Sequence, residues 1–347
     1  MKKIIRVLSI VMLLAVCVSL FAGCGDNRPV LKVYNWGDYI GEKVVKDFED
    51  KYNIKVVYDQ FATNEEMYAK MKAGADDYDV IIPSDYMIKR MINEDMLTKI
   101  NLNNIPNYKY IEDRFKNLNY DSKNEYSVPY MWGTVGILYN SKTVKDPVDS
   151  WSILWNKKYE KQIFMLDSQR DSIGITLKML GYSLNTKDQK QLDEAKKKLI
   201  EQKPLVLAYV GDEVKDKMIA NEAEMAVVWS GDAIFMMKQN KDLKYVIPKE
   251  GSNLWFDAMV VPKSSKHTKE AEMFINYMCE TQVAYKNADY IGYSTPHSEA
   301  KNLLPKELTS DKTAYPSTDE VKNCEIFEDL ADSLPIYDKI WNEVKVK

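Results

Sequence analysis

Aromatic and acidic side chains stand together directly after the first predicted strand of the chain. The apolar run 31–34 is typical of a strand, and Trp36, Asp38 and Tyr39 follow it before a helical pattern begins after Gly41. Ligands of α/β proteins bind at the carboxyl ends of strands. Aromatic faces beside a carboxylate favour an organic ammonium ion, which combines a cation–π contact with a charge-assisted hydrogen bond. The alternative interpretation is structural: the two rings staple the start of the helix, and Asp38 lies near its N-cap.

The combination of an aromatic residue with a nearby acid recurs at later strand ends. The residues at these ends are Trp36, Asp38, Tyr39, Ser84, Asp85, Tyr86, Asp171, Trp229, Asp232, Trp255, Asp257 and Tyr293. One such pair is usually structural, whereas four pairs that the topology brings to one cleft favour a binding site. Trp and Tyr faces suit the methylenes and ammonium groups of a slender polycation, and Asp side chains accept its hydrogen bonds. Desolvated carboxylates are unfavourable without a cation, so we expect an open cleft that closes on its ligand by a hinge motion.

The sequence lacks the motifs of several other chemistries. It contains no GxGxxG, Walker, HExxH or GxSxG motif, and its two histidines, His267 and His297, are not at ligand spacing. We therefore expect no cofactor, no metal site and no catalytic activity. Paired carboxylates beside Trp also occur in glycosidases, so an exported carbohydrate-active enzyme is the alternative from a different class. A receptor of the same fold for another organic cation or an amino acid is the nearer alternative.

Alternating strands and helices must position these residues. The first part of the chain predicts helices at 43–52, 64–73 and up to about 94, with strands at 55–58 and 78–82. Such alternation predicts a parallel sheet, in which all strand ends lie at one edge. The loops after the first strand and after the strand at 78–82 should therefore be neighbours.

A second alternating series predicts a second α/β unit, with strands at 163–166, 224–229 and 244–247. Before it, 126–130 and 133–139 are predicted as a pair of strands at which the chain crosses between domains. The segment 254–261 is predicted as a strand that returns to the first unit. About 320 mature residues also favour two domains. The expected fold class is therefore α/β, with two units and a cleft between them.

The first residues predict that the protein is exported. Basic residues precede an apolar run, 7–22, and the sequence Leu-Phe-Ala-Gly then leads to Cys24. This is the pattern of a bacterial lipoprotein signal, in which 1–23 is removed and a lipidated Cys24 holds the protein at the outer face of the cytoplasmic membrane. An ordinary secretory signal cleaved near Gly23 is the alternative.

The net charge of the mature protein limits the classes of partner that it can bind. Removal of 1–23 changes the formal net charge from −4 to −7, because that segment holds three basic residues and no acidic one. An acidic exported protein is a poor nucleic-acid binder and is suited to collecting cations.

The mature chain has few cysteines. Cys17 leaves with the signal, so Cys279 and Cys324 remain besides the anchor. Two cysteines do not make a disulfide framework, and we expect unpaired thiols, with a disulfide as the alternative.

Five segments carry a resemblance to a known family. They are YNWGDY at 34–39, PSDY at 83–86, YSVPYMWG at 126–133, WFD at 255–257 and IGYSTP at 291–296. They resemble the spermidine/putrescine-binding proteins of bacterial ABC transporters, and the likeness extends in order over the mature chain. The resemblance implies a two-lobed periplasmic-binding-protein fold, each lobe a sheet flanked by helices, with the polyamine in the cleft. It also implies delivery of the polyamine to transmembrane permease subunits, and we expect a monomer.

The resemblance implies roles for individual residues. The matched ligand-binding positions are Trp36, Asp38, Tyr39, Ser84, Tyr86, Asp171, Trp229, Asp232, Trp255, Asp257 and Tyr293. Asp257 resembles the central carboxylate of the family, which binds an amine. Asp171 stands where the family has a Glu, whose longer side chain reaches a terminal amine. Ser168 and Phe327 stand where spermidine-preferring members have an acid and a Gln. Asp232 instead resembles the putrescine-preferring branch, so the two ligands stay open, with spermidine slightly favoured as the broader family label.

The expected division of the chain follows from the signal pattern and the crossing strands. It comprises a signal peptide (1–23), a tether with the lipidated Cys24 (24–30), a first lobe (31–135 plus 258–302) and a second lobe (136–257 plus 303–347). Each lobe is therefore built from two stretches of the chain.

Overall fold

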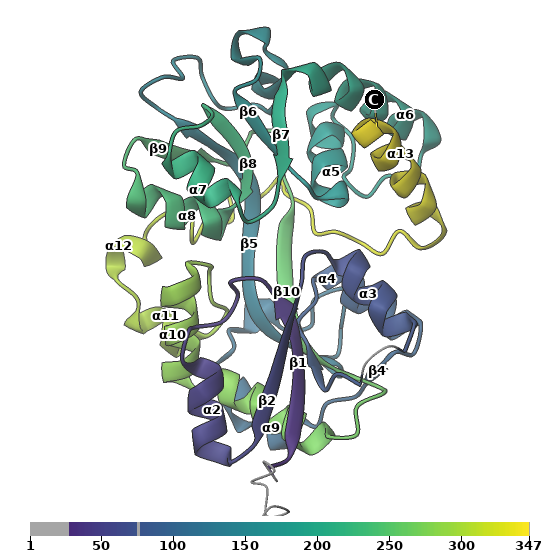
Figure 1. The fold of residues 1–347 in the computed structure, drawn as a ribbon, viewed down its shortest axis with the longest axis vertical. Coiled ribbons are helices and arrows are strands. Elements are labelled where there is room, and N and C mark those ends of the chain that lie inside the picture. The colour runs from purple at the N-terminus through teal and green to yellow at the C-terminus, as the bar shows by residue number, and fades with distance from the viewer. Residues whose placement is uncertain (1–27, 75–76, 347) are drawn as a thin grey trace, which may run out of the picture.

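The computed structural model describes residues 28–74 and 77–346. The predicted signal peptide and Cys24 lie outside these residues, so export and lipid anchoring stay predictions. Figure 1 shows two lobes, one above the other, each with strands at its centre and helices outside. Two long strands, β5 and β10, run through the middle and join the lobes. Within the described ranges, no helix has both the length and the apolar character needed to cross a bilayer.

Ten paired strands form the framework of the part of the chain that the structure describes. They are β1 (Val30–Trp36), β2 (Lys55–Phe61), β3 (Val80–Ile81), β4 (Leu97–Thr98), β5 (Ser127–Asn140), β6 (Ile163–Leu166), β7 (Val206–Val210), β8 (Met225–Trp229), β9 (Leu243–Val246) and β10 (Leu254–Pro262). Their order is β2-β1-β3-β10-β5-β8-β6-β7, with β4 beside β10 and β9 beside β5. The two crossing strands are therefore neighbours at the centre of the sheet.

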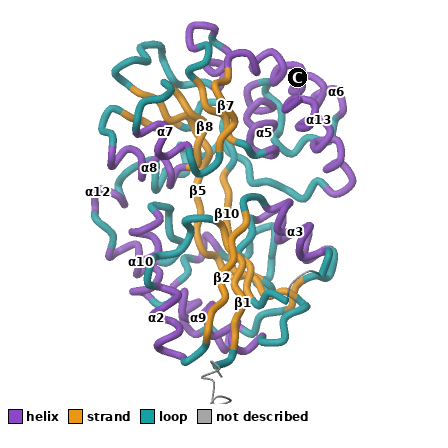
Figure 2. The backbone as a smooth tube through the Cα atoms, in the orientation of Figure 1, coloured by secondary structure: helices purple, strands orange, loops and turns teal. Residues whose placement is uncertain are grey.

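Helices cover the outside of this framework (Figure 2). They are α2 (Val44–Tyr52), α3 (Asn64–Lys72), α4 (Asp85–Asn93), α5 (Gln169–Met179), α6 (Gln189–Gln202), α7 (Val214–Ile219), α8 (Ser230–Gln239), α9 (Thr268–Met278), α10 (Thr281–Ile291), α11 (Ser298–Leu303), α12 (Lys306–Thr309) and α13 (Leu334–Val346). Short 3-10 turns complete the set: η1 (Leu102–Asn104), η2 (Pro106–Tyr110), η3 (Asp113–Phe115), η4 (Trp151–Trp155), η5 (Lys157–Tyr159), η6 (Lys203–Leu205) and η7 (Ala331–Ser333).

The first lobe contains the predicted parallel strands. β1 pairs in parallel with β2 on one side and with β3 on the other. Leu31 and Val33 of β1 are fully buried, as the alternation of a packed strand requires. α3 begins where the Thr63 hydroxyl accepts a 3.1 Å hydrogen bond from the Glu66 N–H, which satisfies an otherwise free amide of its first turn. The loops after β1 and β3 consequently leave the same edge of the sheet.

The predicted strand pair at 126–130 and 133–139 is wrong, because β5 is one uninterrupted strand. Its Ser127–Thr134 half pairs with β10, and its Val135–Asn140 half pairs with β8 and β9. Gly133 does not form a turn: a Cβ placed there would lie 2.6 Å from both Ser230 Oγ and Trp255 Cζ2. This glycine provides room for an indole rather than a bend.

The second lobe and the return strand follow the predicted alternation, with one strand added. β6 pairs in parallel with β7 and β8, and β10 returns to the first lobe as expected, where it runs antiparallel to β5 and β3. The additional strand is β7, whose half-exposed centre (Leu207, Ala208) gives a weak apolar pattern directly after the turn η6. The proposed lobe boundaries stay predictions.

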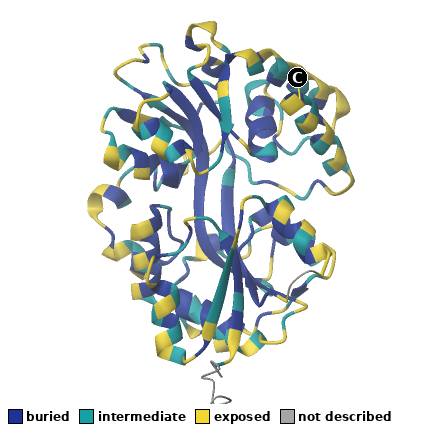
Figure 3. Cartoon of the chain, viewed as in Figure 1, coloured by how far each residue is buried: buried dark blue, intermediate teal, exposed yellow. Residues whose placement is uncertain are grey.

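Burial is concentrated on the strands, whereas the helices keep an exposed outer side (Figure 3). Nearly all of β5 is buried, since it is covered by helices in both lobes. α13 packs against α5 and α6, which places the end of the described chain on the second lobe. Cys279 is buried, Cys324 is half-buried, and both are free thiols.

Candidate ligand-binding site

The carboxylate of Asp257 lies at the centre of the predicted site. It is 5% exposed and belongs to β10, where the register shifts between Asp257 and Ala258. Its Oδ2 accepts a 2.7 Å hydrogen bond from the Tyr39 hydroxyl, and its Oδ1 has no hydrogen-bond partner among the described residues. Burial raises the pKa of Asp257 to about 6, while the Ser84 and Tyr39 hydroxyls act in the opposite direction. One oxygen is thus oriented by the protein, and the other is available to a donor.

Three further buried aspartates lie in the first turns of helices that follow strands. They are Asp85 of α4, Asp171 of α5 and Asp232 of α8. An acid in the first turn compensates the positive end of the helix dipole. Burial is the main cause that raises the pKa of each of these carboxyl groups. The first turn of each of these helices therefore holds a desolvated carboxyl group of the protein itself, and it is not left open for an external anion.

Asp85 and Asp171 already have partners within the protein. Asp85 accepts hydrogen bonds from the backbone N–H groups of Tyr86 (2.6 Å) and Phe256 (3.0 Å), so it fastens α4 to β10. Asp171 accepts from the Ser168 hydroxyl at 2.7 Å and from the Asn253 amide at 3.2 Å. Asp171 is close enough to raise the pKa of Asp257, so the fold brings these two predicted acids near each other.

A wall of three aromatic rings stands beside Asp257. The Tyr293 ring lies edge-to-face with Tyr39 (5.5 Å between centroids) and with Trp255 (5.2 Å). Gly231 makes this possible, because a Cβ there would lie 2.2–2.4 Å from the Tyr293 ring. The Nε1 atom of Trp255 is buried without a hydrogen-bond partner among the described residues. The predicted residues Tyr39, Trp255 and Tyr293 are therefore brought together with the central carboxylate.

The predicted aromatics Trp36 and Trp229 make no ring contact with this wall in the described structure. Trp36 packs on Phe61, with 4.5 Å between the ring centroids. Trp229 is the last residue of β8, lies opposite Val135 and is half-buried.

Ser84 and Tyr86 lie at one end of the site, together with a cation that the sequence analysis missed. The backbones of Ser84 and Asp257 form an isolated antiparallel β-bridge. The Tyr86 hydroxyl donates to Glu65 at 2.9 Å and accepts from Asn64 at 3.1 Å. Arg170, only 3% exposed, places its guanidinium 4.9 Å from the centre of the Tyr86 ring. The face of this predicted aromatic is therefore partly covered by a protein side chain.

Asp38 and Asp232 lie at the other end, and they share a second missed cation, Lys215 of α7. Asp38 has a left-handed backbone (φ +48°) and a 70% exposed side chain that lies 3.1 Å from Lys215 Nζ. Asp232 Oδ1 lies 3.9 Å from the same ammonium, while its Oδ2 has no partner among the described residues. The only local sequence feature that could have indicated an ion pair of Lys215 was Asp212, an acid three residues before it.

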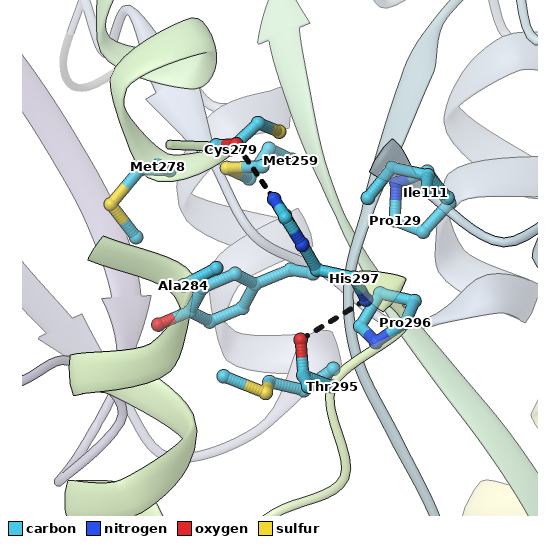
Figure 4. Close-up of a pocket in the computed structure, with 11 residues that line it drawn as sticks. Ile111, Pro129, Met259, Met278, Cys279, Ala284, Thr295, Pro296 and His297 are labelled. Atoms are coloured by element: carbon cyan, nitrogen blue, oxygen red, sulfur yellow. Dashed lines mark hydrogen bonds between the residues drawn. The ribbon is translucent and has the colours of Figure 1, made fainter. Parts of the chain in front are cut away.

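A small cavity in the first lobe is not part of this site (Figure 4). Apolar and weakly polar side chains line it, among them Met259, Met278 and Pro129. His297 at its centre pairs through Nε2 with the Cys279 carbonyl and accepts through Nδ1 from the Ala300 N–H. No carboxylate lines the cavity. Across residues 28–74 and 77–346 no cluster of His, Cys, Asp and Glu is arranged to hold a metal ion.

The two-lobed α/β fold, with acidic and aromatic side chains where the lobes meet, is that of a bacterial solute-binding protein. The chain belongs to the family of bacterial extracellular solute-binding proteins, whose profile matches residues 43–316. It is 33% identical over 334 residues to the spermidine/putrescine-binding periplasmic protein of Escherichia coli, covering 95% of this chain and 96% of that protein.

Two solved structures are similar over most of their length. A Listeria monocytogenes protein assigned to a spermidine/putrescine ABC transporter is 43% identical, with a TM-score of 0.89 over 91% of this chain and 98% of that chain. The lipoprotein TpPotD of Treponema pallidum is 30% identical, with a TM-score of 0.83 over 92% and 100% of the chains. The expected fold and the family resemblance are thereby confirmed.

Proposed function

We propose that this protein is the polyamine receptor of an ABC importer and binds spermidine, putrescine or both where its lobes meet. One observation carries the proposal: the buried carboxylate of Asp257 has an oxygen without a hydrogen-bond partner among the described residues, and it lies beside the ring wall of Tyr39, Trp255 and Tyr293. A buried carboxylate without a counter-ion is unfavourable, and an ammonium group is the matching partner. The ring faces provide contact for the methylenes between two ammonium groups.

The expected strength of these contacts is sufficient for a receptor. A hydrogen bond to a charged group contributes about 1.5–3 kcal/mol, and a cation–π contact about 0.5–2 kcal/mol. Two or three of each, less the entropy of association, correspond to roughly micromolar affinity or better. Hinge closure of the lobes would exclude water and strengthen each of these contacts.

The names of the relatives support this assignment. The Escherichia coli relative is named as a spermidine/putrescine-binding protein, and the Listeria relative is assigned to a transporter of the same solutes. The receptor would act as a monomer without catalysis or cofactor and would deliver its ligand to transmembrane permease subunits. The proposed ligand-binding residues are Trp36, Asp38, Tyr39, Ser84, Tyr86, Asp171, Trp229, Asp232, Trp255, Asp257 and Tyr293.

Calorimetric titration of the mature domain with spermidine and with putrescine tests the function. We expect saturable binding of at least one amine; no heat with either at high micromolar concentration would overturn the proposal. A thermal-shift panel of other organic cations and amino acids separates the nearest alternative, because a true ligand raises the melting temperature by mass action.

The membrane anchor is a separate part of the proposal. Cys24 follows the lipoprotein pattern, and the Treponema pallidum relative is described as a lipoprotein. Metabolic labelling with a tagged fatty acid in a bacterial host should mark the wild-type protein and not Cys24→Ser. Equal labelling of both would exclude anchoring at this residue.

A further inference from the structure

Lys215 carries a half-buried ammonium group that the proposed function has not used. Its side chain is 15% exposed and reaches three carboxylates: Asp38 at 3.1 Å, Asp212 at 3.7 Å and Asp232 at 3.9 Å. Asp38 lies in the loop after β1, whereas the other three residues lie on or beside α7 and α8. Figure 1 shows that loop directly below these two helices, so the ammonium group bridges the two lobes.

The partners of Lys215 distinguish it from the buried cation Arg170. Arg170 donates to the Glu328 carbonyl and the Asn185 side-chain oxygen, and it stacks on rings. Lys215, in contrast, makes its three ion pairs with carboxylates alone. An ammonium group on a flexible chain of methylenes, held by aspartates beside Tyr293, has the same chemistry as the end of a bound polyamine.

We propose that Lys215 is a specificity-determining residue that fills one ammonium position of the site and so favours diamines over triamines. The proposal rests on the proposed function and deepens it. A ligand ammonium directed at Asp38 and Asp232 would meet a like charge already in place. A diamine can bind at Asp257 and along the ring wall without approaching Lys215, whereas the third ammonium of a longer amine must displace it or remain unpaired.

Paired titrations test this role. Wild type, Lys215→Met and Lys215→Arg are each titrated with putrescine and spermidine at the same pH, about pH 8, where both amines are still largely protonated. Loss of the charge leaves three acids for the extra ammonium, so in Lys215→Met the affinity ratio should shift about tenfold or more towards spermidine. Lys215→Arg keeps the charge, and its ratio should stay within about threefold of wild type.

A matched control comes from the same helix. Lys217→Met removes an equal charge whose partner, Glu222, lies 3.2 Å away at the surface, and it should leave the ratio unchanged. If Lys215→Met does not melt cooperatively, Lys215→Gln replaces it, because the amide can still donate to one aspartate. An unchanged ratio in the neutral variant, or an equal shift in Lys217→Met, would overturn the role of Lys215. Wild type that binds neither amine would instead overturn the proposed function.

Discussion

The hydroxyl of Tyr39 donates a 2.7 Å hydrogen bond to Oδ2 of Asp257, although the two are 218 positions apart in the chain. The bond ties the loop after β1 to β10, one of the two strands that join the lobes. It also fixes the orientation of the carboxylate, whose Oδ1 has no partner among the described residues. The same tyrosine ring continues the aromatic wall through Tyr293, so one side chain organises both the charge and the ring faces of the site.

Replacement of the central acid should remove most of the affinity. Asp257→Asn keeps the shape of the side chain and deletes its charge, which should weaken polyamine binding by about 1.5–3 kcal/mol, or roughly 10- to 150-fold. Calorimetry measures the loss. Asp149→Asn is the control, because that acid forms an exposed ion pair with Lys249. Equal affinities for wild type and Asp257→Asn would show that the amine is bound elsewhere.

Removal of the orienting hydroxyl should have a smaller and pH-dependent effect. The hydroxyl of Tyr39 lowers the pKa of Asp257, so Tyr39→Phe should raise that pKa. Near neutral pH, binding should weaken about 3- to 10-fold, and the pH below which affinity falls should move upward. Titrations across a pH series measure both quantities. Tyr182→Phe, which loses only an exposed hydrogen bond to Glu194, should reproduce the wild-type profile.

Fold stability and amine binding should depend on pH in opposite directions. Burial raises the pKa of Asp257 to about 6 and that of Asp232 to about 7. A raised carboxyl pKa stabilises the fold at low pH, and this contribution is lost as the pH rises through about 6–7. An amine, protonated throughout, pairs only with the ionised acids. The ligand-induced rise in melting temperature should therefore grow between about pH 5 and pH 8; a constant rise would contradict these assignments.

The close contact of Gly231 with Tyr293 should make this glycine irreplaceable. A Cβ at Gly231 would lie 2.2–2.4 Å from the ring, so Gly231→Ala should displace Tyr293 and destabilise the fold by about 1–3 kcal/mol. Urea unfolding gives the stability, and titration gives the accompanying loss of affinity. Gly211→Ala is the control, because its Cβ would meet only the Glu213 carboxylate at 3.4 Å. Wild-type stability for Gly231→Ala would show that the ring can move freely.

Local sequence patterns predicted most of the framework. Apolar runs and helix signals located the parallel strands β1 to β3 and the return strand β10, since side-chain periodicity is a local property. The same reasoning divided β5 into two strands, 126–130 and 133–139, because local periodicity does not reveal which distant side chain packs against a glycine such as Gly133. The indole of Trp255, more than a hundred residues later, occupies the space that this glycine leaves.

The amino-acid sequence by itself identified Asp257, Tyr39, Trp255 and Tyr293 of the proposed site, although Trp255 and Asp257 lie within β10 and not at a strand end as predicted. Only the tertiary structure decided which hydrogen-bond or ion-pair partner each acid has. Asp85 is held by backbone amides, whereas Asp38 meets Lys215 across 177 residues of chain. The physical reason is that charge pairing depends on distances of a few ångströms between lobes, and no local periodicity encodes those distances.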